Sequence, residues 1–206
     1  MIQEEFKFYK PCKLLQPYVR YYWVFSSNQM LKTYTFPIGC PQIIFHKRTP
    51  LYVPELDTTQ HRLTISGQVN FSSHLQADDD IEMIVVVFYP HTINLFLDTP
   101  ASSFYNKEVS GYDIEDKHLA ELAKQVFKCE DNNHCVDLIE RWLLSRLSIR
   151  PYETTYRVRR MTAAIEQLCA APQTLITDLS STCCLCKKQF EREFCLHVGM
   201  NPKEYS

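Results

Sequence analysis

The amino-acid sequence predicts an α+β protein in which a strand-rich N-terminal part precedes a helical C-terminal part. Short aromatic and β-branched segments, separated by turn residues, recur through residues 1–115. Apolar residues then recur every three or four positions from residue 116 onwards, which is the period of an amphipathic helix. The composition, 45% hydrophobic and 22% charged over 206 residues, is typical of globular chains that bury a sizeable core.

Five segments of the strand-rich part predict β-strands, because they are aromatic or β-branched and are bounded by turn residues. Short strands at this spacing are typical of a small barrel or sandwich. In the last segment an uninterrupted apolar run fills residues 83–88, so we expect that strand to be buried on both faces. The five predicted strands are residues 18–25, 31–36, 42–45, 61–67 and 82–89.

Three amphipathic helices follow, predicted by apolar stripes over residues 119–127, 136–147 and 155–168. The first two form a helical pair within residues 116–150, which either packs on the strand-rich domain of residues 1–115 or forms a seam between two copies. Pro151 ends the second helix, and we expect a flexible linker around residues 149–154. Residues 151–206 then form a separate helical module.

The end of the chain, residues 176–205, predicts a helix-turn-helix unit. Leu179 and Cys183 lie four positions apart on one helical face, and Phe190 and Phe194 repeat this step on a second helix. The few residues between the two helices allow only a tight corner, as in units whose second helix enters the major groove of DNA. Gly199 suits the left-handed residue after a helix end.

One face of the second predicted helix is polar, long-armed and mostly cationic, as contacts to phosphates and base edges require. This face lies opposite the two phenylalanines, with its lysines near the N-terminal end of the helix. The alternative for all four residues is an ordinary solvated face. For Arg192 alone, a further alternative is a contact that braces the fold through a carboxylate such as Asp178. The predicted DNA-binding residues are Lys187, Lys188, Glu191 and Arg192.

This C-terminal pattern resembles the first helix-turn-helix of AraC/XylS-type transcription regulators. The resemblance implies a regulator that binds operator DNA through residues 186–196, responds to a small-molecule effector and forms a homodimer. That family usually has Gly in the turn and Ser at the helix cap, where this chain has Cys184 and Cys186. Losing the cap hydrogen bond costs about 1 kcal/mol. The matching residues are Phe190, Arg192, Phe194, Gly199, Pro202 and Tyr205.

The family also carries a second helix-turn-helix downstream, whereas this chain ends at Ser206. We therefore expect an incomplete DNA-binding module, and both a truncation and a natural loss remain open. More loosely, residues 11–115 resemble a sensor-like domain found before DNA-binding domains of this family. The matching features are the strand ending near Trp23, the Pro-x-Gly turn of residues 37–39 and the Phe-Tyr-Pro-His run of residues 88–91. This resemblance implies a cupin-like β-barrel in which a bound effector alters dimer geometry or releases the DNA-binding module.

Two alternatives to a regulator stay open: a cupin-type metal-dependent enzyme and a regulator remnant that serves only as a dimerisation or interaction module. Metal binding is not predicted, because the cysteines of the C-terminal cluster lack a Cys-x-x-Cys pair and the histidines lack a His-x-His pair. We expect no enzyme activity and no cofactor. The acidic run of residues 78–80 predicts a solvated hairpin tip. The clusters considered are Cys183, Cys184, Cys186, Cys195 and His197, and the histidines His46, His61, His74 and His91.

Charge and cysteine content limit the partners and the compartment. The net charge is −2, and residues 151–206 hold 7 Lys and Arg against 6 Asp and Glu, so that part is only marginally basic and should bind DNA weakly. Nine cysteines, an odd number without regular spacing, favour free thiols in a reducing cytoplasm. No stretch is long and apolar enough for a membrane span, and the acidic N-terminus does not resemble a secretory signal.

Overall fold

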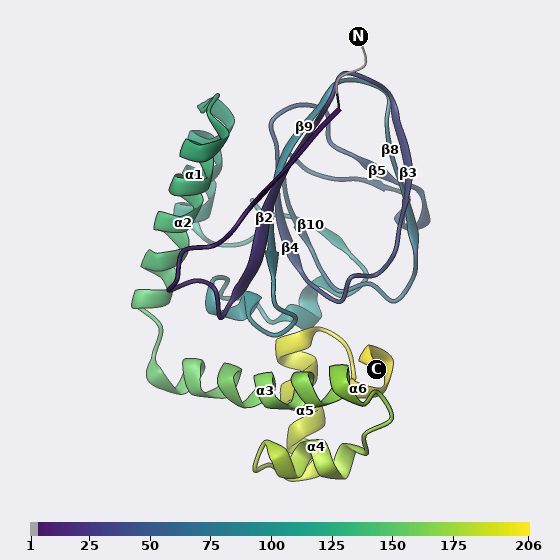
Figure 1. Cartoon of the computed structure of the whole chain (residues 1–206), viewed down its shortest axis with the longest axis vertical. Coiled ribbons are helices and arrows are strands. Elements are labelled where there is room, and N and C mark those ends of the chain that lie inside the picture. Colours follow the sequence, from purple (N-terminus) through teal and green to yellow (C-terminus); the bar gives the residue numbers. More distant parts are fainter. Residues whose placement is uncertain (1–3) are drawn as a thin grey trace.

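The computed structural model, which describes residues 4–206, confirms the predicted α+β class (Figure 1). Two β-sheets pack face to face, two helices cover the outer face of the larger sheet, and a helical module lies below the strand-rich part in the view of Figure 1. None of the helices in this described range combines the length and the apolar character needed to cross a bilayer.

The larger sheet has six antiparallel strands, and the smaller sheet has four. In spatial order the larger sheet contains β1 (Glu4–Tyr9), β2 (Val19–Ser27), β9 (Ile81–Phe88), β4 (Gln42–His46), β7 (Leu63–Ser66) and β10 (Glu108–Ser110). The smaller sheet contains β3 (Leu31–Thr35), β8 (Ser73–Ala77), β5 (Tyr52–Val53) and β6 (Thr58–Thr59).

The predicted closed barrel is wrong, because the two sheets do not join into one. The connection from β3 to β4 shows one physical reason. It contains Pro37 and Pro41, which lack the N–H that a ladder needs, and Gly39 in the left-handed region at φ 65°. β3 therefore pairs with β8 in the other sheet, and the domain is an open sandwich.

Strand β9 is the centre of the sandwich, and its predicted burial on both faces is confirmed. Ile84 and Val86 face the cluster that also contains α1 and α2, whereas Met83 and Val85 face the smaller sheet. β9 pairs with β2 on one side and with β4 on the other, so Val85 stands opposite both Trp23 and Ile44. Full burial on both faces explains why this strand reads as a continuous apolar run.

The helical pair α1 (Lys117–Lys128) and α2 (Asn132–Ser148) packs its apolar stripes on the outer face of the larger sheet (Figure 1). Asp116 and Asp131 cap the two helices by accepting backbone N–H bonds. Glu140 of α2 ties the pair to the sheet domain, since it accepts from the Tyr22 hydroxyl at 3.1 Å and from the Cys12 amide at 2.8 Å.

Three short 3₁₀ helices complete the sandwich: η1 (Pro54–Leu56), η2 (Ile93–Leu95) and η3 (Ala101–Phe104). The segment between η2 and η3 fixes the junction with the helices. Arg146 donates to Asp98 at 2.6 Å, and Arg150 donates to the Leu95 carbonyl at 2.6 Å and also pairs with Asp98. The expected linker is therefore short and held by arginine contacts on the sandwich.

The helical module consists of α3 (Tyr152–Ala170), α4 (Ile176–Thr182), α5 (Lys187–Val198) and α6 (Pro202–Tyr205). It has an apolar core of its own, which is separate from the two clusters of the sandwich. In Figure 1, α3 lies across the lower end of the sandwich, and α5 crosses behind α3 from α4 towards the strands.

Candidate functional site

The α4–α5 corner buries the four residues that the sequence pattern places inside. Leu179 of α4, Cys183 at the C-cap of α4, and Phe190 and Phe194 of α5 are all buried in the module core. The two phenylalanine rings lie 5.6 Å apart between centroids, and Tyr205 of α6 meets Phe194 edge-on at 5.8 Å. The predicted helix pair is thus held by aromatic packing along one side of α5.

The turn between α4 and α5 carries the two departures seen in the sequence. Cys184 occupies the left-handed region at φ 52°, which a residue with a Cβ adopts only with strain. Cys186 is the N-cap of α5 and accepts no helix N–H with its side chain. Its thiol instead contacts Gln189 Oε1 at 3.3 Å. The corner closes although neither position has the residue that fits it best.

The four predicted DNA-binding residues lie on the side of α5 that turns away from this core. Lys187 and Lys188 are exposed at the N-terminal end, Glu191 is half-buried, and Arg192 is 68% exposed. Arg192 approaches Glu193 at 3.6 Å, so the alternative pairing with Asp178 is not seen. In Figure 1 this end of α5 points away from the sandwich.

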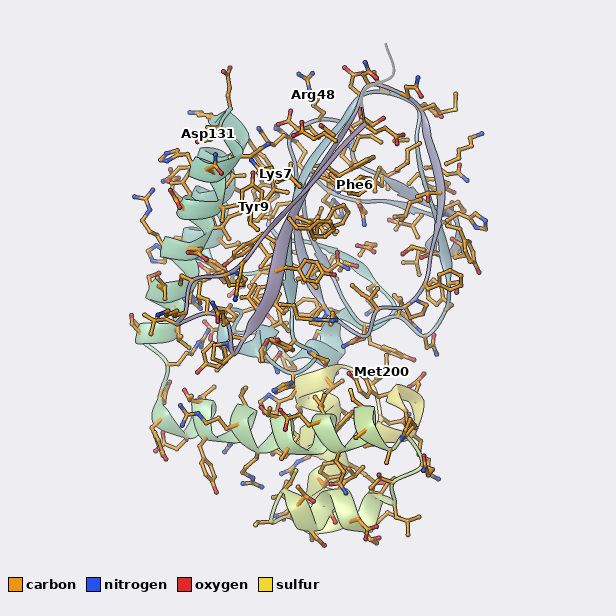
Figure 2. The ribbon with its side chains drawn as sticks, viewed as in Figure 1. Phe6, Lys7, Tyr9, Arg48, Asp131 and Met200 are labelled. Carbon is orange, nitrogen blue, oxygen red and sulfur yellow. The ribbon has the colours of Figure 1, made fainter. Side chains whose placement is uncertain are left out.

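The C-terminal end of α5 is fixed on the sandwich. Gly199 ends the helix at φ 100°, and a Cβ added there would lie 3.1 Å from the Ala101 carbonyl of η3. Asn94 Nδ2 donates to the Leu196 carbonyl at 2.7 Å. Met200 is buried at the same contact, between the module and the sandwich in Figure 2. The helix therefore has one free end and one docked end.

Helix α6 adds a second set of contacts between the module and the sandwich. Glu204 accepts from Asn70 Nδ2 at 2.6 Å and from the Tyr105 hydroxyl. Tyr205 packs beside Gly39, whose positive φ brings the chain close to its ring. These contacts join the C-terminal helix to residues about a hundred or more positions earlier in the sequence.

Two buried histidines stand at this junction. His91 Nε2 lies 2.8 Å from Thr162 Oγ1 of α3, and burial lowers the pKa of His91 to about 4. His197 of α5 lies 3.8 Å from Glu193, and burial lowers its pKa as well. Both imidazoles are therefore uncharged near neutral pH and act as packing groups between the two parts.

A cavity of about 770 Å³ lies between the sandwich and α3. Arg20 and Arg159 lie at its wall, and Arg20 donates to the buried Cys40 Sγ at 3.2 Å. Tyr205 closes another side. This cavity touches both parts of the molecule.

A second cavity, of about 300 Å³, lies between the two sheets. Its walls come mainly from apolar and aromatic side chains, among them Trp23, Phe36 and Phe71. A smaller set of polar groups gathers on the β7–β10 side, where Ser66 and Glu108 meet across neighbouring strands. Mostly apolar pockets with a few placed polar groups are the usual form of a small-molecule site.

The cysteines and the histidine considered for a metal do not gather. Cys183 is buried and donates to the Arg160 carbonyl at 3.3 Å, whereas Cys184 and Cys186 are exposed. Cys195 is half-buried and His197 is buried in the junction. All nine cysteines are free thiols.

The four histidines of the strand-rich part are also dispersed. His46 is bonded to Gln60 and His91 to Thr162, while His74 lies near the surface beside Glu55, 2.6 Å away. His61 is exposed. Over residues 4–206, no group of three His, Cys, Asp or Glu side chains is arranged to hold a metal ion.

The acidic run is exposed as predicted, but it is not a hairpin tip. Asp78, Asp79 and Asp80 connect β8 to β9, and these strands belong to different sheets. The connection therefore crosses between the layers of the sandwich.

Sequence reasoning missed the polar groups of the inner cavity. Glu108 stands in a three-residue strand, and Gln60 in a loop, so neither belongs to a pattern long enough to reveal a face. Ser66 is at the end of a predicted strand, but its partner lies 42 positions away. Glu108 stands in the mostly polar run of residues 106–110, and that run gives no sign of a buried carboxylate.

Comparisons with known proteins give one family and a set of distant structures. The model of the family described as Domain of unknown function (DUF6597) matches residues 7–110. No curated protein matches the sequence. Among solved structures, ToxT from Vibrio cholerae matches at 10% identity and a TM-score of 0.27, with 97% of each chain covered. The unsaturated fatty acid-bound ToxT of strain SCE256 matches at 10% identity and a TM-score of 0.28, over 100% of this chain and 96% of that chain.

Proposed function

The chain belongs to the family described as Domain of unknown function (DUF6597), whose match ends with β10, and we propose that the helical module after this domain makes the protein a DNA-binding transcription regulator. In this proposal α5 enters the major groove, and the sandwich senses a small molecule. The observation that carries the proposal is the division of α5 into a buried aromatic side and an exposed cationic end.

The position of the lysines supports a role in DNA contact. Helix-turn-helix proteins contact base edges with the N-terminal residues of their second helix. Lys187 and Lys188 are the first two residues of α5, and their side chains are exposed. The positive end of the helix dipole adds to their attraction for phosphate. Arg192, one turn further, extends the same face, while Glu191 limits its charge.

The charge of the module predicts weak, salt-sensitive binding. Residues 151–206 carry 7 Lys and Arg against 6 Asp and Glu. Affinity for DNA rises with the number of phosphates that a protein neutralises, and it falls with salt in proportion to that number. We therefore expect a modest affinity in which each exposed lysine of α5 carries a large share.

The proposal is tested with the full 206-residue chain and a DNA probe selected by that chain from a randomised duplex pool. Fluorescence anisotropy of the labelled duplex then compares wild type with the Lys187→Ala, Lys188→Ala double variant. We expect the double variant to bind at least tenfold more weakly at low salt. Its log–log salt slope should fall by about 2 if both lysines contact phosphates.

Two lysines of α1 provide a matched control, because Lys124 and Lys128 are also exposed on a helix but lie far from α5. Their double alanine variant should bind like wild type. All variants should show the unchanged thermal unfolding of the parent, since none of these side chains is buried. If no duplex is enriched, or if the α5 lysines prove as dispensable as those of α1, the chain does not bind DNA in this way.

The proposed activity is binding without catalysis. Over residues 4–206, no three His, Cys, Asp or Glu side chains gather to hold a metal ion. Metal analysis of the purified protein tests this point: stoichiometric iron, zinc or manganese would favour the enzyme alternative. A homodimer remains part of the proposal, and sedimentation of the free and DNA-bound chain measures it.

A further inference from the structure

The cavity between the two sheets has an aromatic interior. Tyr21 and Trp23 of β2 line it from the larger sheet, and Phe36 and Phe71 line it from connecting segments. On β1, Phe6 and Phe8 also border the cavity although they are 58% and 65% exposed. Figure 2 labels Phe6, Lys7 and Tyr9 on this edge strand, and Phe6 lies beside the Phe25 ring at 4.4 Å. Exposed aromatic residues thus flank one open edge of an apolar space.

Glu108 is the only charged side chain among the described residues that line this cavity. Its Oε2 atom is buried and has no hydrogen-bond partner within residues 4–206. A buried carboxylate oxygen without a donor is costly, because nothing replaces the water that it loses. Within residues 4–206, no lysine or arginine lines the cavity to neutralise it. The wall therefore presents one unmatched negative group inside an aromatic space.

The other oxygen of Glu108 is held in place by a polar chain. Ser66 Oγ donates to Glu108 Oε1 at 3.0 Å, and the Gln60 side chain approaches the same carboxyl group, where it favours the ionised form without making a hydrogen bond to Oε2. Gln60 Oε1 in turn lies 2.9 Å from His46 Nε2. Because an amide oxygen only accepts, this contact assigns the proton of the His46 ring to Nε2. Glu108 Oε1 is therefore held in place, whereas the buried Oε2 lacks a partner among residues 4–206.

We propose that the cavity between the sheets binds a small organic cation with an apolar or aromatic body, whose ammonium group donates to Glu108 Oε2. The ammonium supplies both the missing hydrogen bond and the missing positive charge. The aromatic walls add a second attraction, since the faces of Trp, Tyr and Phe rings attract cations. An anionic or merely apolar ligand would leave Oε2 unmatched. This ligand class deepens the effector role in the proposed regulator, but its test needs no DNA.

The ionisation of Glu108 gives the site a pH signature. Burial raises the pKa of Glu108 to about 7. His46 is the titratable group that Gln60 links to this carboxyl group. Burial lowers the pKa of His46 to about 4, so His46 stays neutral from pH 6 to 8. Ser66 and Gln60 do not titrate. A cation binds the ionised carboxylate, so its affinity should rise about tenfold from pH 6 to pH 8 and its binding should release a proton near pH 6.5.

Three probes with the same ring separate the ligand classes: 2-phenylethylamine, 2-phenylethanol and 3-phenylpropionate. Isothermal titration calorimetry with the full chain measures their affinities and, in two buffers of different ionisation enthalpy, the proton release. We expect the amine to bind at least tenfold more tightly than the other two. Trp23 reports the location, because an amine-induced fluorescence change should vanish in Trp23→Phe, which leaves Trp142 as the other tryptophan.

The variant Glu108→Gln removes the charge and keeps the shape, and it should abolish both the preference for the amine and the pH dependence. Glu130→Gln is the matched control, because Glu130 is exposed in the α1–α2 connection. Should Glu108→Gln fail to fold, the three-probe series and the pH dependence on wild type still decide.

The inference is wrong if the amine does not bind, if the propionate or the alcohol binds as tightly, or if Glu108→Gln binds the amine like wild type. These outcomes leave DNA binding by α5 untouched. Conversely, loss of DNA binding in the lysine variants says nothing about the cavity. The two proposals therefore fail separately.

Discussion

The two ends of α5 differ in every property that matters for function. At the N-terminal end, Lys187 and Lys188 are exposed, the cap residue Cys186 makes no side-chain bond to the helix, and the preceding Cys184 has a strained positive φ. At the C-terminal end, the helix closes on Gly199, which needs no Cβ, and is packed against η3 of the sandwich.

Along this single helix, the contacts that stabilise the fold lie at one end and the residues proposed to bind DNA lie at the other. The docked end uses residues that suit their backbone and bury apolar surface, so changes there should alter folding. The free end has residues that fit their backbone poorly, namely Cys184 at positive φ and Cys186 at the N-cap. Replacing them should therefore increase stability without removing any core contact.

The largest effect is expected from Phe194→Ala, which removes a fully buried ring at the centre of the module. The loss of packing around Phe190 and Tyr205 should reduce the free energy of unfolding by roughly 3–5 kcal/mol. Urea unfolding followed by far-UV circular dichroism measures it. Leu196→Ala, a partly exposed position on the same helix, serves as the control and should cost far less. Equal losses in both variants would mean that the ring is not the anchor.

A smaller loss is expected from Gly199→Ala at the docked end. The added Cβ meets the Ala101 carbonyl at 3.1 Å, and the φ of 100° is one that side chains rarely adopt. Strain of this kind costs roughly 1–3 kcal/mol. Thermal unfolding should show the loss together with increased amide exchange at η3. A stable Gly199→Ala variant with unchanged exchange would show that the close contact is not maintained in solution.

At the free end we expect a gain in stability instead of a loss: Cys184→Gly should raise the free energy of unfolding of the module. Glycine adopts φ 52° without the Cβ clash that cysteine suffers, so we expect a gain of about 1 kcal/mol. Cys184→Ala is the matched control, because it removes the thiol but keeps the strain, and it should gain nothing. A gain in the alanine variant alone would assign the effect to the thiol and not to the backbone.

The smallest effect is expected from Cys186→Ser at the N-cap of α5. A serine hydroxyl accepts from the helix N–H groups that the thiol leaves without a side-chain partner, for a gain of about 0.5–1 kcal/mol. Cys186→Ala should give no gain. Both variants keep Lys187 and Lys188, so DNA affinity should stay within a factor of about two of wild type.

Much of the fold follows from local patterns in the sequence. The four-residue steps from Leu179 to Cys183 and from Phe190 to Phe194 predict the helix corner, and burial confirms them. The edge strand β1 was not predicted, because the alternation of Phe6 and Phe8 with Lys7 is short and follows two acidic residues. The two-residue strands β5 and β6 are too short for any periodic signal. The predicted barrel was wrong because the pairing of strands across the sandwich has no local signature.

The sequence by itself determined the main helices, the central strands β2 and β9, the corner and the glycine stop at Gly199, since these depend on neighbours within one or two turns of the chain. Only the tertiary structure decided that the docked end of α5 meets η3 and that Glu108 faces an aromatic cavity beside Ser66. Those contacts join segments tens of residues apart. Their free energy depends on which surfaces meet after folding, and no periodic pattern records it.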